Sequence, residues 1–346
     1  MQLNYLGNTG IKVSKICLGT MTFGEQNTEA EGHSQLDMAL DYGINFIDTA
    51  EMYSIPPRAE TYGSTETIIG NWLQKTGKRD QVVLTSKVIG KADDWMPHVR
   101  NGRARLNRSN IETAINNSLK RLKTDVIDLY QIHWPDRNTN FFGQLEYQYQ
   151  PDDSAAAIDE TLSVLKDLVQ TGKVRQVGVS NETPWGLMEY LRLSDKLDAP
   201  RIVSIQNPYN LLNRSFEIGL SEFSHNENIG LLAYSPLAFG VLSGKYLEQQ
   251  PANARLTLFP AYHRYSSENA QKATAAYVGL AHDNGLSPAQ MALAFVTSRP
   301  FVCANIIGAT TLTQLKENIE SINITLSDEV LGGIEEIHQN NTNPCP

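Results

Sequence analysis

Short apolar runs that end in reactive polar residues recur along this sequence of 346 residues. One run is followed directly by His133 and another by Lys87, while a third ends in Asp48, with Tyr53 five residues later. In a (β/α)8 barrel, the C-terminal ends of the parallel strands meet at one rim and carry the functional side chains. The pattern therefore predicts an α/β fold of this type, a TIM barrel.

Strand-like and helix-like segments alternate along the chain, as this fold requires. We expect eight strands, at Ile16–Leu18, Phe46–Asp48, Val82–Ser86, Val126–Ile132, Val174–Val179, Ile202–Gln206, Ile229–Tyr234 and Ala304–Ile307. We expect helices at Glu29–Tyr42, Thr65–Thr76, Ser109 (as cap) to Leu122, Ile158–Gln170, Thr183–Asp195 and Thr311–Ser321. An N-terminal β-hairpin at Leu3–Val13 is expected to plug the barrel, and an extra C-terminal helix, capped by Ser327, is expected at Leu326–His338. Residues 1–346 are predicted to form a single barrel domain.

Composition excludes several classes of protein. Apolar residues make up 41% of the chain, and the net charge is −9. The negative charge argues against nucleic acid as a partner, because phosphate binding needs a basic face. We found no apolar run of about 18 residues and no basic segment followed by an apolar core at the start, so we expect a cytoplasmic protein without a membrane span. Neither the seven histidines nor the three cysteines have metal-ligand spacing, so no metal is predicted.

Two long segments between the expected elements are candidate functional loops. Pro135–Ala156 directly follows His133 and is rich in aromatic and amide residues, and Gly240–Ser266 follows the seventh strand. Loops of this length on a barrel are usually functional lids or oligomer contacts, although disordered surface segments also occur. We favour a lid for the first loop because of its position.

Asp48, Tyr53, Lys87 and His133 together form a set suited to proton delivery. A phenol has a pKa of about 10, and a neighbouring ammonium lowers it. We therefore expect Lys87 to lower the pKa of Tyr53, with Asp48 as the counter-ion of the lysine. A histidine on the same rim can orient a carbonyl oxygen or assist proton transfer. The set has no source of electrons, so a cofactor has to supply them.

The second half of the chain has features suited to binding a cofactor that contains phosphate. The segment Ile306–Thr311 joins the last strand to a helix, whose N–H groups and dipole can bind phosphate. Gln314, Glu317 and Asn318 follow on one face of that helix. The run Gly240–Lys245 imitates a P-loop, but it is one residue short and no Ser or Thr follows the lysine. No Gly-x-Gly-x-x-Gly follows an early strand, which argues against a Rossmann domain.

Over nearly its whole length, the sequence resembles the aldo-keto reductase family, and within it the bacterial Tas proteins and the potassium-channel β-subunits. Several independent motifs occur in the order of the family, which makes the resemblance specific. The matching stretches are Gly19–Met21, Asn45–Tyr53, Leu84–Lys87, Gln131–His133, Gly178–Asn181, Gln206–Tyr209, Ser235–Leu237 and Gly308–Asn318.

The resemblance implies a barrel that binds NADPH in an extended pose and reduces aldehydes or ketones to alcohols. It implies Tyr53 as the proton donor, Lys87 and Asp48 as the pair that tunes it, and His133 as the residue that orients the carbonyl.

The resemblance also implies a set of cofactor-binding residues. Ser180, Asn181 and Gln206 would hold the nicotinamide carboxamide, and Tyr209 would stack on the ring. The other implied residues are Gly19, Thr20, Met21, Asp48, Tyr234, Ser235, Pro236, Leu237, Gly240, Lys245, Arg255, Gly308, Thr310, Gln314, Glu317 and Asn318.

The chain departs from the family at the position that often binds the 2′-phosphate. Many members have a Lys-Ser pair after the eighth strand, whereas this chain has Gly308 and Ala309. The channel-subunit branch instead uses a lysine and an arginine ten residues apart on the strand-seven loop. Because Lys245 and Arg255 have this spacing, we expect them to bind the 2′-phosphate.

Three functions are open at this point. The first is an NADPH-dependent reductase of small carbonyl compounds, the second a nucleotide-sensing regulatory subunit with weak reductase activity, and the third a barrel lyase or isomerase without a redox cofactor. The intact set of four residues favours the first over the second, and the cofactor motifs disfavour the third. Phe23, Trp95 and Trp134 are candidates for the substrate pocket, and the oligomeric state is left open.

Overall fold

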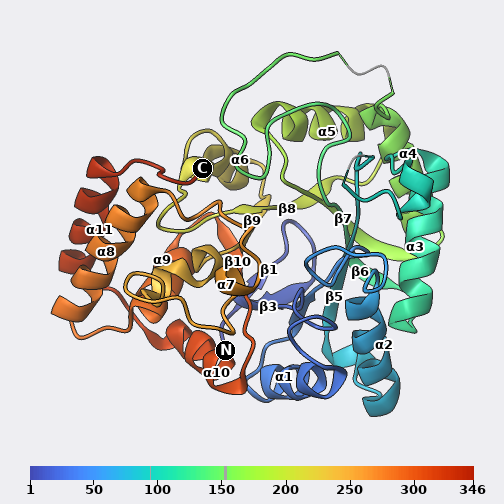
Figure 1. Cartoon of the computed structure of the whole chain (residues 1–346). Coiled ribbons are helices and arrows are strands. Elements are labelled where there is room, and N and C mark those ends of the chain that lie inside the picture. The colour runs from blue at the N-terminus through green and yellow to red at the C-terminus, as the bar shows by residue number, and fades with distance from the viewer. Residues whose placement is uncertain (94, 152–153) are drawn as a thin grey trace.

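Eight parallel strands form a closed barrel at the centre of the molecule (Figure 1). The computed structural model describes residues 1–93, 95–151 and 154–346. Neighbouring strands pair in the order β10-β3-β4-β5-β6-β7-β8-β9, and the predicted (β/α)8 barrel is thereby confirmed. The strands are β3 (Ile16–Gly19), β4 (Phe46–Asp48), β5 (Val83–Val88), β6 (Ile127–Ile132), β7 (Val174–Ser180), β8 (Ile202–Pro208), β9 (Gly230–Tyr234) and β10 (Val302–Ile307).

Helices surround the barrel, and each helix expected from the sequence is present (Figure 1). Two long helices were not expected: α8 is rich in alanine, and α9 buries apolar residues on nearly all sides, so neither shows a clear amphipathic pattern. The helices are α1 (Glu29–Asp41), α2 (Ser64–Thr76), α3 (Arg108–Leu122), α4 (Ile158–Gln170), α5 (Pro184–Leu197), α6 (Leu220–Asn226), α7 (Arg255–Leu258), α8 (Glu268–Asp283), α9 (Pro288–Ser298), α10 (Leu312–Glu320) and α11 (Asp328–Asn340).

Polar side chains cap several of these helices. Ser327 caps the extra C-terminal helix α11 as predicted, since its side chain accepts the backbone N–H of Val330. The predicted cap of α3 at Ser109 is wrong. The cap is Asn107, whose side chain accepts the backbone N–H of Asn110 at 3.1 Å, and Ser109 lies within the first turn.

The predicted N-terminal hairpin consists of β1 (Leu3–Tyr5) and β2 (Lys12–Ser14), which pair antiparallel. Its apolar residues Leu6 and Val13 are fully buried. They pack in one cluster with residues from the strands, among them Cys17, Phe46, Leu129, Leu232 and Ala304. The hairpin thus fills one end of the barrel and leaves the other end to the site.

The two long loops have different structures. The segment 240–266 contains the end of a 3-10 helix (Ala238–Ser243) and the short helix α7. The described part of Pro135–Ala156 forms no helix or strand and is drawn as an extended green trace in Figure 1, while residues 152–153 lie outside the described part. Its base is closed, because the Asp136 carboxylate accepts the backbone N–H of Ala156 at 2.7 Å.

Candidate active site

A cavity of about 1200 Å³ opens at the C-terminal ends of the barrel strands. Most of the residues predicted from the sequence line this cavity, and they lie at or beyond the C-terminal ends of all eight strands. They are Gly19, Thr20, Met21, Asp48, Tyr53, Trp95, His133, Ser180, Asn181, Gln206, Tyr234, Ser235, Pro236, Leu237, Gly240, Lys245, Arg255, Gly308, Thr310, Gln314, Glu317 and Asn318. The structure therefore brings segments from all parts of the chain together at one rim, where barrels of this type place their functional residues.

Lys87 and Asp48 form a buried ion pair at this rim. The Lys87 Nζ lies 2.7 Å from Oδ2 of Asp48 and donates a second hydrogen bond to the carbonyl of Thr49 at 2.8 Å. The other Asp48 oxygen accepts from Nε2 of Gln206 at 2.8 Å. Both side chains are thus shielded from water but paired and hydrogen-bonded, which offsets the cost of burying them.

Tyr53 and His133 lie side by side above this ion pair. Their ring centroids are 5.8 Å apart, and the Lys87 Nζ lies 5.0 Å from the Tyr53 ring centroid. Burial, and then the charge of Lys87, hold the pKa of His133 well below its usual 6.5. The imidazole is therefore neutral at neutral pH and can donate or accept one hydrogen bond at each nitrogen. Among the described residues, nothing bonds its Nδ1.

Tyr53 does not have the lowered pKa that we expected from the sequence. Burial, and then the charge of Asp48, raise the pKa of Tyr53 well above its usual 10.0, and only Arg255 acts in the opposite direction. The Lys87 ammonium is directed to Asp48 and to the face of the ring, so it does not bond the phenol oxygen. The phenol therefore carries its proton at neutral pH, as an acid catalyst has to.

Polar side chains at the ends of β7, β8 and β9 are bonded to one another. The Ser180 hydroxyl donates to the carbonyl of Gln206 at 2.7 Å, and the Asn181 amide donates to the carbonyl of His133 at 2.9 Å. The Tyr234 hydroxyl donates to Oδ1 of Asn181 at 2.7 Å. These bonds fix the amide groups on the cavity wall, with Tyr234 beside them.

Two cations of the segment after β9 line the cavity. The Lys245 Nζ lies 5.2 Å from the ring centroid of Tyr246, and the Arg255 guanidinium lies 5.4 Å from that of Phe239. Burial lowers the pKa of both side chains, and among the described residues no carboxylate offsets this effect for either one. Partly buried cations without an acidic partner are costly, so this wall is suited to an anionic ligand.

The N-terminus of α10 lies at the same cavity. Thr311 caps this helix by accepting the backbone N–H of Gln314 at 3.2 Å, and the Gln314 amide oxygen accepts the N–H of Thr310 at 3.1 Å. The Asn318 amide donates to the carbonyl of Gly308 at 3.1 Å. Because the helix dipole favours negative charge at this end, the segment is suited to a phosphate or to polar groups of a nucleotide.

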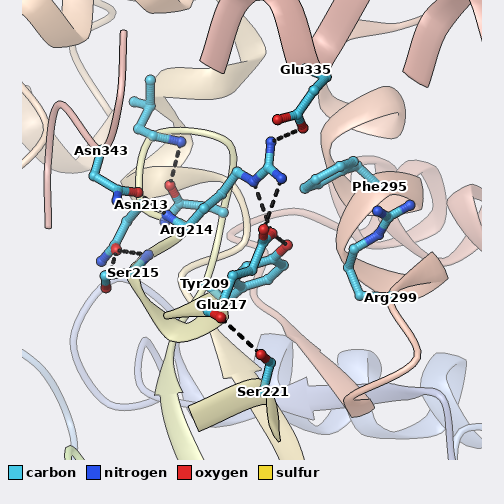
Figure 2. A network of polar contacts seen from close by, with 12 residues as sticks. Tyr209, Asn213, Arg214, Ser215, Glu217, Ser221, Phe295, Arg299, Glu335 and Asn343 are labelled. Carbon is cyan, nitrogen blue, oxygen red and sulfur yellow. Dashed lines mark hydrogen bonds and ion pairs between the residues drawn. The ribbon is translucent and has the colours of Figure 1, made fainter. Parts of the chain in front are cut away.

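Tyr209 does not line the cavity, so its predicted role as the ring that stacks on the nicotinamide is wrong. Its side chain is fully buried, stacks on Phe295 at 6.2 Å between centroids, and donates its hydroxyl hydrogen bond to Glu217 (Figure 2). Glu217 is also held by Arg214 through two bonds of 2.8 Å. Of the two tyrosines after β8 and at the end of β9, Tyr234 is the one that lines the cavity.

Two of the three residues predicted for the substrate pocket are also placed elsewhere. Phe23 is fully buried against Gly32 of α1, and Trp134 is fully buried with its indole N–H bonded to the carbonyl of Lys91 at 3.0 Å. Trp95 does line the cavity, and its ring centroid lies 5.2 Å from that of Trp134. Trp134 therefore packs against the Trp95 ring and does not line the cavity itself.

Several cavity residues were not identified from the sequence. Phe142 and Leu145 reach the cavity from the first long loop, whose aromatic content had pointed to the loop but not to these residues. Arg264 and the tail Pro344–Pro346 also line it, and the Arg264 Nε donates to the carbonyl of Pro346 at 3.3 Å. No periodic pattern marks these positions, because they lie outside the regular elements.

The described residues contain no group of three or more potential metal-ligating side chains. None of the helices in this part of the chain is sufficiently long and apolar to cross a membrane.

Comparisons with known proteins find similar sequences over nearly the whole chain. The sequence model of the aldo/keto reductase family matches residues 15–339. The chain is 54% identical over 347 residues to the protein tas of Escherichia coli (strain K12), covering 100% of both chains. It is 34% identical to YrpG, an uncharacterized oxidoreductase of Bacillus subtilis (strain 168), with 97% of this chain and 96% of that one covered. It is 29% identical to the L-glyceraldehyde 3-phosphate reductase of Escherichia coli (strain K12), with 97% and 92% covered.

Proposed function

Because the chain belongs to the aldo-keto reductase family, we propose that it is an NADPH-dependent oxidoreductase that reduces small aldehydes or ketones to alcohols. The observation that carries the proposal is the arrangement at the rim. A protonated phenol and a neutral imidazole lie side by side at the cavity, above the buried pair of Lys87 and Asp48. This arrangement can deliver a proton to an oxygen atom that is held between Tyr53 and His133.

The cavity is suited to NADPH in size and charge. A volume of about 1200 Å³ exceeds the roughly 300–1,000 Å³ of ordinary small-molecule sites, so it can hold a dinucleotide and a small substrate together. Lys245, Arg255 and the N-terminus of α10 are suited to the phosphates. Ser180 and Asn181 offer hydroxyl and amide groups at the same cavity.

We assign a separate role to each residue of the reaction. When bound, the nicotinamide supplies a hydride to the carbonyl carbon. The neutral His133 orients the carbonyl oxygen by a hydrogen bond, and Tyr53 donates its proton to that oxygen. Lys87 pairs with Asp48 and thereby compensates the carboxylate charge beside Tyr53. Of the residues predicted for the substrate pocket, we retain Trp95, and we add Phe142 and Leu145, which line the same cavity.

Arg255→Ala is expected to weaken NADPH binding by about ten-fold or more and to leave NADH binding nearly unchanged. A charge-assisted hydrogen bond is worth about 1.5–3 kcal/mol, and only NADPH carries the 2′-phosphate that Arg255 would bind. Binding is measured by fluorescence titration instead of turnover, because the Arg255 charge also acts on the pKa of Tyr53. The matched control is Arg192→Ala, an exposed arginine of α5 whose partner is Glu189. Equal losses for both cofactors, or no loss for either, would place the 2′-phosphate elsewhere.

The proposed function is tested by following NADPH consumption with a panel of aldehydes, ketones and sugars. We expect catalytic turnover with at least one class of carbonyl compound. Tight NADPH binding without turnover of any compound would instead favour a nucleotide-sensing regulatory subunit, and a lack of NADPH binding would favour a barrel enzyme without a redox cofactor.

A further inference from the structure

Glu51 is a fully buried carboxylate in the turn between Asp48 and Tyr53, and it does not line the cavity. We propose that Glu51 is a positioning residue that fixes the Tyr53 side chain for proton delivery by joining its turn to the end of β5. The inference rests on the proposed function, because it assumes that Tyr53 is the proton donor.

Four hydrogen bonds satisfy the Glu51 carboxylate. Oε1 accepts the backbone N–H of Ile89 at 2.9 Å and one guanidinium N–H of Arg100 at 3.0 Å. Oε2 accepts the other guanidinium N–H of Arg100 at 2.8 Å and the hydroxyl of Tyr62 at 2.6 Å. The arginine contact is bidentate, which holds the carboxylate in one plane and one position.

These bonds tie the catalytic turn to the strand that carries Lys87. Ile89 lies two residues after Lys87, and the backbone N–H of Glu51 donates to the carbonyl of Lys87 at 3.2 Å. Glu51 is therefore joined to the end of β5 through both its side chain and its main chain. Tyr53 follows two residues later, and its N–H donates to the carbonyl of Ala50 at 3.1 Å. A shift of Glu51 would therefore move Tyr53 relative to Lys87.

The charge of Glu51 is needed as well as its shape. Glu51 is the carboxylate that pairs with the Arg100 guanidinium, and the Arg100 side chain is only 12% exposed. Although burial lowers the pKa of Arg100, the Glu51 charge and hydrogen bonds raise it overall. A neutral amide at position 51 cannot hold the guanidinium bidentately and leaves a buried cation without compensation, so the loop that carries Arg100 would lose its anchor.

Asp128, a residue of β6, provides a matched control because it is bonded to the opposite end of β5. It is also buried, accepts a β5 backbone N–H, that of Leu84, at 2.8 Å, and pairs with Arg79 and Arg175. The two carboxylates have the same kind of environment and differ in their distance from Tyr53. Asp128→Asn therefore reports the loss of stability that comes with neutralising a buried carboxylate that is bonded to β5.

The test is a double-mutant cycle between Glu51→Gln and Tyr53→Phe, with kcat for carbonyl reduction, NADPH affinity and thermal unfolding measured for each variant. A misplacement of about 1 Å costs about 100-fold in rate, so we expect Glu51→Gln to lower kcat by about that factor. Its NADPH affinity should be nearly unchanged. The double variant should be no slower than Tyr53→Phe alone, because a misplaced phenylalanine has no proton to deliver.

The control variant separates positioning from a general loss of stability. Asp128→Asn should lower the unfolding temperature while leaving kcat within about two-fold of the unmodified protein. If Glu51→Gln does not fold, Tyr62→Phe removes a single donor to the same carboxylate and should show a smaller loss of kcat with the same non-additivity.

Four results would overturn the inference. Glu51→Gln with unchanged kcat, or with its full loss retained in the Tyr53→Phe background, would show that Glu51 does not act through Tyr53. Equal losses of kcat in Glu51→Gln and Asp128→Asn would assign the effect to stability. If Tyr53→Phe itself keeps its kcat, the proposed function fails first and the inference falls with it.

Discussion

Tyr53→Phe is expected to lower kcat for carbonyl reduction by about 10²–10⁴-fold, the range that general acid catalysis supplies. NADPH affinity should be nearly unchanged, because the substitution removes one hydroxyl and no charge. Burial and Asp48 hold the pKa of Tyr53 well above 10.0, so the phenol of the unmodified protein stays protonated up to that pH. A tyrosine with its usual pKa of 10.0 would ionise as the pH approaches 10. We therefore also expect that kcat is not lost through ionisation of Tyr53 between pH 7 and pH 10.

The matched control for this substitution is Tyr209→Phe. Tyr209 is also a buried tyrosine whose hydroxyl donates a hydrogen bond, but its ring packs on Phe295 outside the cavity. The Tyr209→Phe substitution should lower the stability of the protein and leave kcat and NADPH affinity nearly unchanged. A Tyr53→Phe variant that keeps more than about half of kcat would remove the general-acid role, and a loss of cofactor binding in Tyr209→Phe would contradict the corrected position of that residue.

Lys87→Met is expected to cost at least as much in kcat as the tyrosine substitution. Without the ammonium, Asp48 faces Tyr53 with its charge uncompensated, so the phenol pKa rises further and the proton is donated less readily. The variant should also lose about 3–5 kcal/mol of folding free energy, because removing one partner of a buried ion pair leaves the other charge unpaired. Single-turnover kinetics measure the first effect, and denaturant unfolding measures the second.

The double variant Lys87→Met with Asp48→Asn tests whether both losses come from the unpaired Asp48 charge. Removing both charges should recover much of the lost stability, since no unpaired charge is left in the barrel. It should also recover part of kcat, because the carboxylate charge that raises the phenol pKa is removed as well. Recovery of stability without any recovery of kcat would mean that Lys87 acts on the reaction by another route than compensating the Asp48 charge.

The barrel was predictable from the sequence because most of its elements show strong local patterns. Buried strands such as Val126–Ile132 read as short apolar runs, and helices such as α4 show one apolar face. The helix α9 escaped detection because it is buried nearly all round and has no polar face. Whether an element shows a recognisable hydrophobic pattern depends on which of its sides other elements cover. The sequence alone does not reveal that arrangement.

Tyr209 and Tyr234 show how side-chain direction separates two similar positions. Gln206 lies within β8 and faces the cavity, whereas Tyr209 follows the last residue of that strand and does not line the cavity. Successive residues of a strand point to opposite sides. Tyr234 pairs with Pro208 and lies two residues after Leu232, which packs in the interior cluster. The sequence motifs place both tyrosines near strand ends, and strand alternation would have favoured Tyr234.

Other parts of the site depend on long-range packing and could not be predicted. Phe142, Arg264 and Pro346 meet at the cavity although they lie far apart in the chain. The pKa of Tyr53 follows the same logic: the residue types suggested that Lys87 would lower it, whereas burial and the closeness of Asp48 dominate. Burial is a property of the folded molecule, so this sign could not be obtained from residue types alone.

The most direct test of the central claim follows the hydrogen that the cofactor supplies. NADPH that carries deuterium at the transferable position of its nicotinamide is incubated with the protein and a carbonyl compound from the productive class, and the alcohol is analysed by mass spectrometry and NMR. The account predicts one deuterium at the carbinol carbon of the product, with its formation strongly slowed in Tyr53→Phe. Alcohol formed without deuterium at that carbon, or formed equally fast without Tyr53, would contradict it.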